Sequence, residues 1–295
     1  MSIPVPSPVV AALTPFQRSG TVDPAALRDQ LHLLTAAGVR ALLVNGTTGE
    51  FAACTDAERR TVLELCRAAW PGTLIAHIGG GPIGDVLARA EHAHDHADLL
   101  AVITPFFHAD PPRTGVEEYL RRVLAGLRLP TLLYSFPRHT RTPLAPESLA
   151  QLAAEFPEVV AGIKDSGKDR AVSAEYKSRC PQLAVLLGDD GVGARIRELG
   201  LDGVVSGAGG PVAELPVAIA AAVAVGDGAE ADRLQRVFDR YGACRRALPL
   251  IDIAVAKAAL AERLPGFARA VRPPLTAADA EQTRTIGAVV RTVLA

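Results

Sequence analysis

The segment Val159-Val160-Ala161-Gly162-Ile163-Lys164-Asp165-Ser166-Gly167 is an apolar run that ends in a lysine and an aspartate. Apolar and polar residues do not alternate within it, which is typical of a parallel strand that is buried on both faces. The lysine therefore stands at the carboxyl end of a predicted strand. The number of such strands, and the residues that end them, decide the fold class and the place of any site.

Seven further runs rich in Val, Ile and Leu have the same character, and they are Val9–Phe16, Ala41–Asn45, Thr73–Ile78, Leu99–Thr104, Thr131–Ser135, Leu183–Leu187 and Gly203–Val205. An amphipathic stretch follows each run, and pairs such as Asp23-Pro24 and Thr55-Asp56 place a capping residue before it. Gly38 and Gly200 stand just past expected helix ends. Eight strand–helix units in about 220 residues predict a (β/α)8 barrel, or TIM barrel.

The pattern changes after Gly226, where helical segments follow one another without strands. These segments are Ala229–Leu248, Ile251–Leu264 and Thr276–Leu294. We therefore expect a catalytic barrel domain over residues 1–225 and a three-helix C-terminal domain over residues 226–295. A doubly wound open sheet is the alternative fold, but the first predicted strand lacks the G-x-G-x-x-G that such folds use to bind dinucleotides.

Composition excludes several classes of function. The 295 residues are 49% hydrophobic and 21% charged, and the net charge of -1 gives no electrostatic reason to expect nucleic acid or membrane partners. No apolar run approaches the roughly 20 residues that span a bilayer, and the N-terminus lacks a signal-peptide pattern. Four widely spaced cysteines without a C-x-x-C motif suit reduced thiols. We expect a cytoplasmic protein with a small-molecule substrate.

Lys164 is unusual because arginine is the ordinary basic residue of this chain, in which only four of 31 basic residues are lysines. Apolar neighbours partly desolvate its ammonium group, which favours the neutral amine, and a neutral amine can attack a carbonyl carbon. The alternative is a lysine that pairs with Asp165 or extends to solvent. The scarcity of lysine elsewhere favours the chemical role.

Two other strand ends carry suitable chemistry. The turn Gly46-Thr47-Thr48-Gly49-Glu50 combines two hydroxyls with backbone N–H groups and can surround a carboxylate, although a turn that merely needs glycine is the alternative. Tyr134 is the only one of four tyrosines at the end of a run. Its phenol can transfer a proton, although an aromatic cap of the barrel is the alternative.

Three histidines lie close together in Glu91-His92-Ala93-His94-Asp95-His96, on a predicted helix. His92 and His96 are four residues apart and share a helix face, so they could hold a metal ion. A solvated helix face is the favoured interpretation. Asp189-Asp190, after the seventh run, is interpreted as a capping or substrate-binding pair because no matching ligand cluster is evident.

The motifs Gly46-Thr47-Thr48-Gly49-Glu50, Tyr134-x-x-Pro137 and Gly162-Ile163-Lys164-Asp165-Ser166 together resemble the dihydrodipicolinate synthase / N-acetylneuraminate lyase family. Further segments agree with this resemblance, namely Thr14-Pro15-Phe16, Gly188-Asp189-Asp190 and Val271-Arg272-Pro273-Pro274. The match covers nearly the whole chain in the correct order. It implies a (β/α)8 barrel with a C-terminal helical domain, assembled as a homotetramer that is a dimer of dimers.

The resemblance also implies roles for the catalytic residues. Lys164 is expected to form an imine with the keto carbon of pyruvate or a larger 2-oxo acid, and Tyr134 to relay protons to and from the substrate. Thr47 is expected to hydrogen-bond Tyr134, and with Thr48 to hold the carboxylate. No metal or organic cofactor is expected, because the protonated imine is itself the electron sink.

Further candidates line the substrate. Gly46 belongs to the carboxylate-binding turn, and Ser206 follows the last predicted strand. Phe107 stands where dihydrodipicolinate synthases have the second tyrosine of a Pro-Tyr-Tyr motif, and it cannot complete their proton relay. His139 stands where they have an arginine for the distal carboxylate of the aldehyde substrate, and Arg138 beside it is a possible replacement.

These departures favour a class I, Schiff-base aldolase, a lyase that cleaves a 4-hydroxy-2-oxo acid or keto-deoxy-sugar acid to pyruvate and an aldehyde, or runs the reverse reaction. Val44-Asn45-Gly46-Thr47-Thr48-Gly49 is similar to keto-deoxy-sugar-acid aldolases, and Gly191 stands where sialic acid lyase has glutamate. The alternatives are a 4-hydroxy-tetrahydrodipicolinate synthase, a related 2-oxo acid dehydratase, and a non-catalytic 2-oxo acid sensor.

Overall fold

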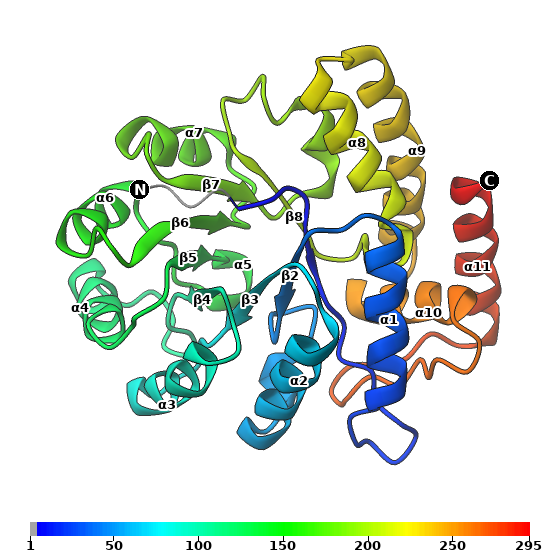
Figure 1. Ribbon diagram of the computed structural model, residues 1–295, viewed down its shortest axis with the longest axis horizontal. Helices are drawn as coiled ribbons and strands as arrows, with labels where there is room; N and C mark the ends of the chain where they lie inside the picture. Colours follow the sequence, from blue (N-terminus) through cyan, green and yellow to red (C-terminus); the bar gives the residue numbers. More distant parts are fainter. Residues whose placement is uncertain (1–4) are drawn as a thin grey trace.

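The strands close into a barrel. In the computed structural model, which describes residues 5–295, eight parallel strands pair in chain order and β1 also pairs with β8 (Figure 1). The strands are β1 (Val9–Ala11), β2 (Ala41–Val44), β3 (Thr73–His77), β4 (Leu99–Ile103), β5 (Thr131–Ser135), β6 (Val160–Asp165), β7 (Ala184–Leu187) and β8 (Gly203–Ser206). The predicted (β/α)8 barrel is confirmed.

Helices surround the strands (Figure 1). The barrel helices are α1 (Pro24–Ala36), α2 (Asp56–Ala69), α3 (Ile83–His94), α4 (Arg113–Leu124), α6 (Pro146–Glu155), α7 (Arg170–Arg179) and α8 (Glu214–Val225). Shorter segments lie between them, namely the 3-10 turns η1 (Phe51–Ala53), η2 (Asp190–Arg195) and η3 (Gly210–Val212) and the helix α5 (Pro137–Thr140). The C-terminal helices are α9 (Gly228–Ala247), α10 (Asp252–Arg263) and α11 (Ala280–Leu294).

Side chains along each strand alternate between the inside of the barrel and the layer beneath the helices, as a two-residue period requires. The cluster inside the barrel comprises Val9, Ala11, Ala41, Leu43, Ile75, Leu99, Ala101, Leu132, Leu186 and Val205. The intervening residues, such as Leu42 and Leu74, belong to the larger cluster beneath the helices. Because both faces are buried, the strands are continuous apolar runs in the sequence.

Three of the four predicted helix-end residues lie at helix ends, and the fourth, Gly200, does not. Asp23 caps α1 by accepting from backbone N–H groups, and Thr55 begins α2 in a capping box with Glu58. Gly38 follows α1 with a φ of +82°, as expected for a left-handed helix end. Gly200 also has a positive φ of +68°, but η2 and irregular turns precede it. The helix expected before Gly200 was therefore wrong.

The first strand is shorter than the run Val9–Phe16 predicted, because a side chain replaces the strand ladder at Leu13. The backbone N–H of Leu13 donates to Gln30 Oε1 at 3.1 Å, and Gln30 Nε2 donates back to the Leu13 carbonyl at 2.9 Å. Phe16 then forms an isolated antiparallel bridge with Val22. The buried amide of Gln30 thus satisfies both backbone polar groups of Leu13, where the chain leaves the barrel wall.

The predicted C-terminal helices are present within one or two residues at most ends, and α11 begins four residues later than Thr276. Their apolar cluster includes Leu215 and Ile219 from α8 together with Phe238 from α9. The division into domains at residue 225 stays a prediction, because α8 and α9 pack against each other across it. Among residues 5–295, none of the helices combines the length and the apolar character that a membrane span requires.

Candidate active site

Lys164 lies inside the barrel near its carboxyl end. The residue is only 7% exposed, and it shares the inward orientation of Gly162 because residues two apart on a strand face the same side. In the pairing of β5 with β6 it stands opposite Tyr134. The Nζ atom of Lys164 lies 4.0 Å from the centre of the Tyr134 ring. The structure therefore brings together the two residues that were predicted to carry the chemistry.

Asp165 does not pair with Lys164. Its Oδ1 accepts from the backbone N–H of Gly167 at 2.8 Å, and its Oδ2 accepts from Ser173 Oγ at 2.6 Å. Adjacent residues of a strand point to opposite faces, so this carboxylate serves the turn and the start of α7 instead. The alternative interpretation of Lys164 as the partner of Asp165 is wrong.

The phenol of Tyr134 reaches the turn after β2. Tyr134 is buried, and its phenol oxygen lies 3.3 Å from Thr47 Oγ1, with either group able to donate. The amine of Lys164 on β6 lies against the ring of Tyr134 on β5, and the phenol oxygen lies within hydrogen-bond distance of the hydroxyl in the turn after β2. These three groups can carry a proton between a substrate at Lys164 and the turn.

The turn itself is held in an unusual backbone conformation. Asn45 and Glu50, which flank it, have positive φ values of +56° and +55°. The N–H of Glu50 donates to the Thr47 carbonyl at 3.0 Å. In the part of the chain that the structure describes, the N–H groups of Thr47 and Thr48 have no recorded protein acceptor. These free donors and the Thr47 hydroxyl are suited to bind a carboxylate.

Thr48 and Ser206, which were both predicted to bind the substrate, lie in different surroundings. A Cβ on Gly207, after β8, would lie 3.5 Å from Thr48 Oγ1, so the backbone after β8 borders the turn. The Ser206 hydroxyl is fully buried and lies beside Asp190, whose pKa is raised by burial and lowered in part by Arg245 and Ser206. The substrate-binding role of Ser206 stays a prediction.

A buried ion pair that the sequence did not reveal supports the turn. Lys257 of α10 is fully buried, and its Nζ lies 2.5 Å from Glu50 Oε1, whose side chain is 1% exposed. The same Nζ donates to the Ala270 carbonyl at 2.7 Å and lies 4.2 Å from the centre of the Phe16 ring. Burial lowers the pKa of Lys257, and the carboxylate of Glu50 opposes that effect.

Arg272 extends this network to α2. Its backbone N–H donates to Glu50 Oε2 at 2.9 Å, and its Nη1 donates to Glu58 Oε2 at 2.7 Å. Its guanidinium also lies 4.2 Å from the centre of the Phe16 ring, on which the two cations Lys257 and Arg272 both pack. One signal of this network was visible in the sequence, since Lys257 is one of the four lysines.

His77 is a second residue that sequence reasoning missed. It ends β3 and is buried, with its ring 6.1 Å from that of Tyr134 in an edge-to-face arrangement. Its Nδ1 donates to the Asn45 carbonyl at 2.8 Å, which leaves a lone pair on Nε2. Burial first, and then the charge of Arg59, lowers the pKa of His77 well below its ordinary value. A polar residue at the end of the third apolar run was the available signal.

The residues predicted for the distal end of the substrate are more exposed. Phe107 is 90% exposed and has a φ of +82°. The His139 ring stacks on Phe136 with centroids 4.0 Å apart, and burial and Arg138 lower the pKa of His139. Arg138 is exposed on α5, and their roles in substrate binding stay predictions.

Removal of the Lys257 charge is expected to destabilise the fold strongly, because it leaves the Glu50 carboxylate buried without a partner. We expect Lys257→Met to lower the free energy of unfolding by about 3–5 kcal/mol, measured by urea denaturation. The double variant Glu50→Gln/Lys257→Met should recover most of that loss. Arg122→Met, which breaks an exposed pair with Glu118, should leave the free energy of unfolding nearly unchanged. Equal losses in the two single variants would contradict a buried pair.

The pair of Glu58 with Arg272 predicts a dependence of stability on acid. Hydrogen bonds from Arg272 are the largest cause that lowers the pKa of Glu58 from 4.5 to about 2. Below pH 4.5 the unfolded chain binds a proton that the folded chain does not, so this contribution is complete above pH 4.5 and is lost as the pH falls toward 2. We expect Glu58→Gln to flatten the stability profile in that range, measured by denaturant titration at successive pH values. Glu281→Gln should keep the profile of the unmodified chain.

Comparisons with known proteins agree with the architecture. Residues 7–293 match the model of the dihydrodipicolinate synthetase family. The chain is 31% identical over 288 residues to a 4-hydroxy-tetrahydrodipicolinate synthase of Chelativorans sp., with 96% of each chain covered. A crystal structure of dihydrodipicolinate synthase from Aquifex aeolicus has a TM-score of 0.87 at 26% identity, with 96% of each chain covered. A Sulfolobus 2-keto-3-deoxygluconate aldolase shares the fold, with a TM-score of 0.88 at 23% identity over 98% of this chain and 96% of that chain.

The match to the family model and the identity to the curated relative both extend over almost the whole chain, in the same order as the motifs at the ends of β2, β5 and β6. The predicted resemblance is thereby confirmed, as is the prediction of an aldolase-type lyase. The chain belongs to the dihydrodipicolinate synthetase family of lyases.

Proposed function

We propose that this protein is a Schiff-base aldolase in which Lys164 binds the keto carbon of pyruvate or of a larger 2-oxo acid. The observation that carries the proposal is the position of the Lys164 amine. It is buried in the barrel, 4.0 Å from the ring of Tyr134, and the phenol of Tyr134 lies 3.3 Å from Thr47. A family of lyases provides the context for this arrangement.

The first stage joins enzyme and substrate. The neutral amine of Lys164 adds to C2 of the 2-oxo acid and forms a C–N bond, while the carbonyl oxygen takes up a proton. The nitrogen then gives up a proton, the new hydroxyl group takes up a second proton and leaves as water, and an iminium ion is left. Tyr134 is placed to deliver and accept the protons, and the Thr47-Thr48 turn is placed to hold the carboxylate.

The second stage breaks a carbon–carbon bond. Tyr134, as the base, takes the proton of the 4-hydroxyl group, and the bond between C3 and C4 breaks. Its electron pair moves into the iminium to give an enamine, while an aldehyde leaves. Protonation of the enamine at C3 and hydrolysis of the C–N bond then release pyruvate and restore Lys164. The reverse sequence joins pyruvate to an aldehyde.

The substrate we propose is a 4-hydroxy-2-oxo acid or a keto-deoxy-sugar acid. Phe107 has no hydroxyl with which to take part in a proton relay, and His139 offers an imidazole where a second carboxylate would need an arginine. We further infer a cytoplasmic homotetramer, built as a dimer of dimers. The 90% exposed ring of Phe107 supports this assembly, because a neighbouring subunit would cover it.

A second candidate is a 4-hydroxy-tetrahydrodipicolinate synthase, which joins pyruvate to aspartate semialdehyde. The Chelativorans relative, at 31% identity, is a 4-hydroxy-tetrahydrodipicolinate synthase, which favours this candidate. Arg138 and Arg141 flank His139 and offer positive charge for a distal carboxylate. Arg141, however, lies 3.7 Å from Asp110 in an ion pair, which reduces its availability.

Borohydride trapping tests the imine directly. With pyruvate and borohydride, we expect the peptide that contains Lys164 to gain the mass of one reduced pyruvate adduct, measured by mass spectrometry, because reduction makes the imine bond permanent. Lys164→Arg should yield no adduct. Lys168→Arg, which replaces an exposed lysine four residues away, should yield the adduct at the level of the unmodified chain. An adduct on any other lysine would contradict the proposal.

Turnover assays separate the two candidate functions. We expect pyruvate and an aldehyde to be released from 4-hydroxy-2-oxo acids or keto-deoxy-sugar acids, with kcat/KM at least about tenfold higher than for condensation of pyruvate with aspartate semialdehyde. Coupled detection of pyruvate measures both reactions. The opposite ratio would identify the synthase. A 2-oxo acid product without any aldehyde would identify a dehydratase, and trapping without turnover would identify a sensor.

A further inference from the structure

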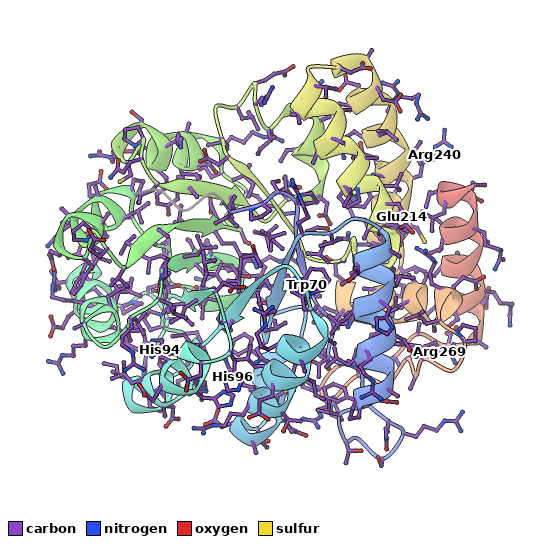
Figure 2. All side chains as sticks on the ribbon, viewed as in Figure 1. Trp70, His94, His96, Glu214, Arg240 and Arg269 are labelled. Carbon is purple, nitrogen blue, oxygen red and sulfur yellow. The ribbon has the colours of Figure 1, made fainter. Side chains whose placement is uncertain are left out.

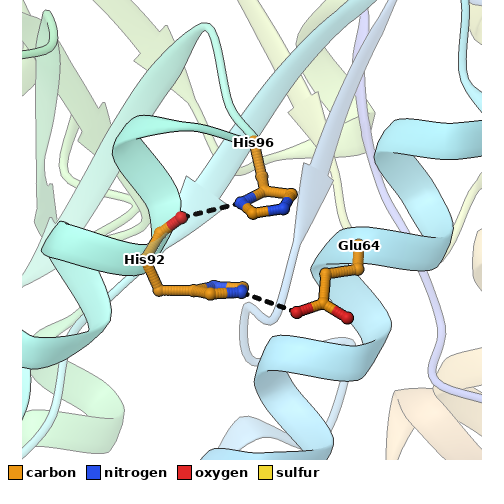
Figure 3. A group of neighbouring side chains, drawn as sticks. All are labelled: Glu64, His92 and His96. Carbon is orange, nitrogen blue, oxygen red and sulfur yellow. Dashed lines mark hydrogen bonds and ion pairs between the residues drawn. The ribbon is translucent and has the colours of Figure 1, made fainter.

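A group of potential metal ligands lies on the outside of the barrel, where α2 and α3 pack against each other. Glu64 of α2 and His92 of α3 face each other, and His96 follows the end of α3 (Figure 3). One ligand atom of each residue lies within 4.8 Å of those of the other two. His96 lies between α3 and α2, whereas His94 lies toward the other side of α3 (Figure 2).

The orientation of His96 leaves a metal-binding nitrogen free. Its Nδ1 lies 2.8 Å from the carbonyl oxygen of His92, which only accepts hydrogen bonds, so the ring proton is on Nδ1 and the lone pair is on Nε2. Histidine ligands of metals commonly donate their second ring N–H to a backbone carbonyl in this way, which fixes the ring. The two imidazoles also stack, with centroids 4.5 Å apart, so both rings are directed toward α2.

Glu64 supplies the third donor. Its Oε1 lies 2.8 Å from His92 Nε2, an ion pair in which the histidine side chain is 14% exposed and the carboxylate 52% exposed. Two donors of one tetrahedral zinc ion lie roughly 3.4 Å apart, given metal–ligand distances near 2.0–2.1 Å. The three donor atoms lie within 4.8 Å of one another, and rotation of the half-exposed Glu64 carboxylate would shorten their separation. The sequence spacing contained the histidine pair but not this carboxylate from another helix.

The surroundings favour a cation. The group lies at the C-terminal end of α3, where the free backbone carbonyls concentrate partial negative charge. The acidic residue Asp95 is the C-cap of the same helix. His94 is otherwise engaged, because its Nε2 accepts from the backbone N–H of Arg128 at 3.2 Å. Each barrel helix starts near the carboxyl end of its strand, so the end of α3 lies at the opposite end of the barrel from Lys164.

We propose that Glu64, His92 and His96 bind one divalent transition-metal ion, with zinc as the reference ligand. Two imidazole nitrogens and one carboxylate oxygen suit zinc, whereas magnesium prefers a shell of oxygen donors. The ion replaces the proton that His92 shares with Glu64 and ties α2 to α3. Water completes the coordination. The site is structural and is independent of the chemistry at Lys164.

Zinc titration of the intact protein tests this site. We expect the metal-free chain to bind one zinc ion, measured by competition with a chromophoric chelator, and the ion to raise Tm. His92→Ala, His96→Ala and Glu64→Gln should each weaken binding at least about tenfold and abolish the rise in Tm. Glu64→Gln is the most informative variant, because the amide oxygen can still accept from His92 and the folded state is retained.

Three controls decide the outcome. His32→Ala removes an exposed histidine from α1 and should leave zinc affinity unchanged. Magnesium at the same concentration should not raise Tm. Circular dichroism establishes that each variant is folded. Zinc binding of equal affinity in the three site variants would place the ion elsewhere, for example on the cysteines, and would overturn the proposal, as would the absence of stoichiometric binding.

Discussion

The ion pair between Glu50 and Lys257 joins the mouth of the barrel to the C-terminal helices. Both side chains are almost completely buried, and either charge alone at that place would be strongly destabilising. The pair therefore forms only when α10 lies against the turn that follows β2. Helix α10 thus supports the turn that is suited to bind a carboxylate, although no predicted site residue lies on α10.

The same network explains why the segment after α10 belongs to the mouth of the barrel. Ala270 and Arg272 contact Lys257 and Glu50 through backbone groups, and the Arg272 side chain continues to Glu58 at the start of α2. Phe16 provides the apolar surface beneath both cations. The network joins the threonine turn at Glu50, whose backbone N–H donates to the Thr47 carbonyl.

The chemistry that we propose depends on the pairing of β5 with β6. A shift of one residue in this pairing would turn Lys164 out of the barrel and Asp165 into it, because side chains alternate along a strand. In the observed register the amine lies on the Tyr134 ring and the carboxylate serves the turn before α7. α2 connects this end of the barrel with the proposed zinc site, since Glu58 lies at its first turn and Glu64 lies farther along it.

The local sequence was sufficient to predict the barrel, its eight strands, the family, and the positions of Lys164, Tyr134 and the threonine turn. Buried parallel strands and capped helices leave a strong periodic signal, and barrel enzymes place their sites at strand ends. Only the tertiary structure decided the partners of Glu50, the place of His77 and the meeting of Glu64 with His92. These contacts join side chains that are far apart in the chain, and no local pattern of residues records which distant groups packing brings together.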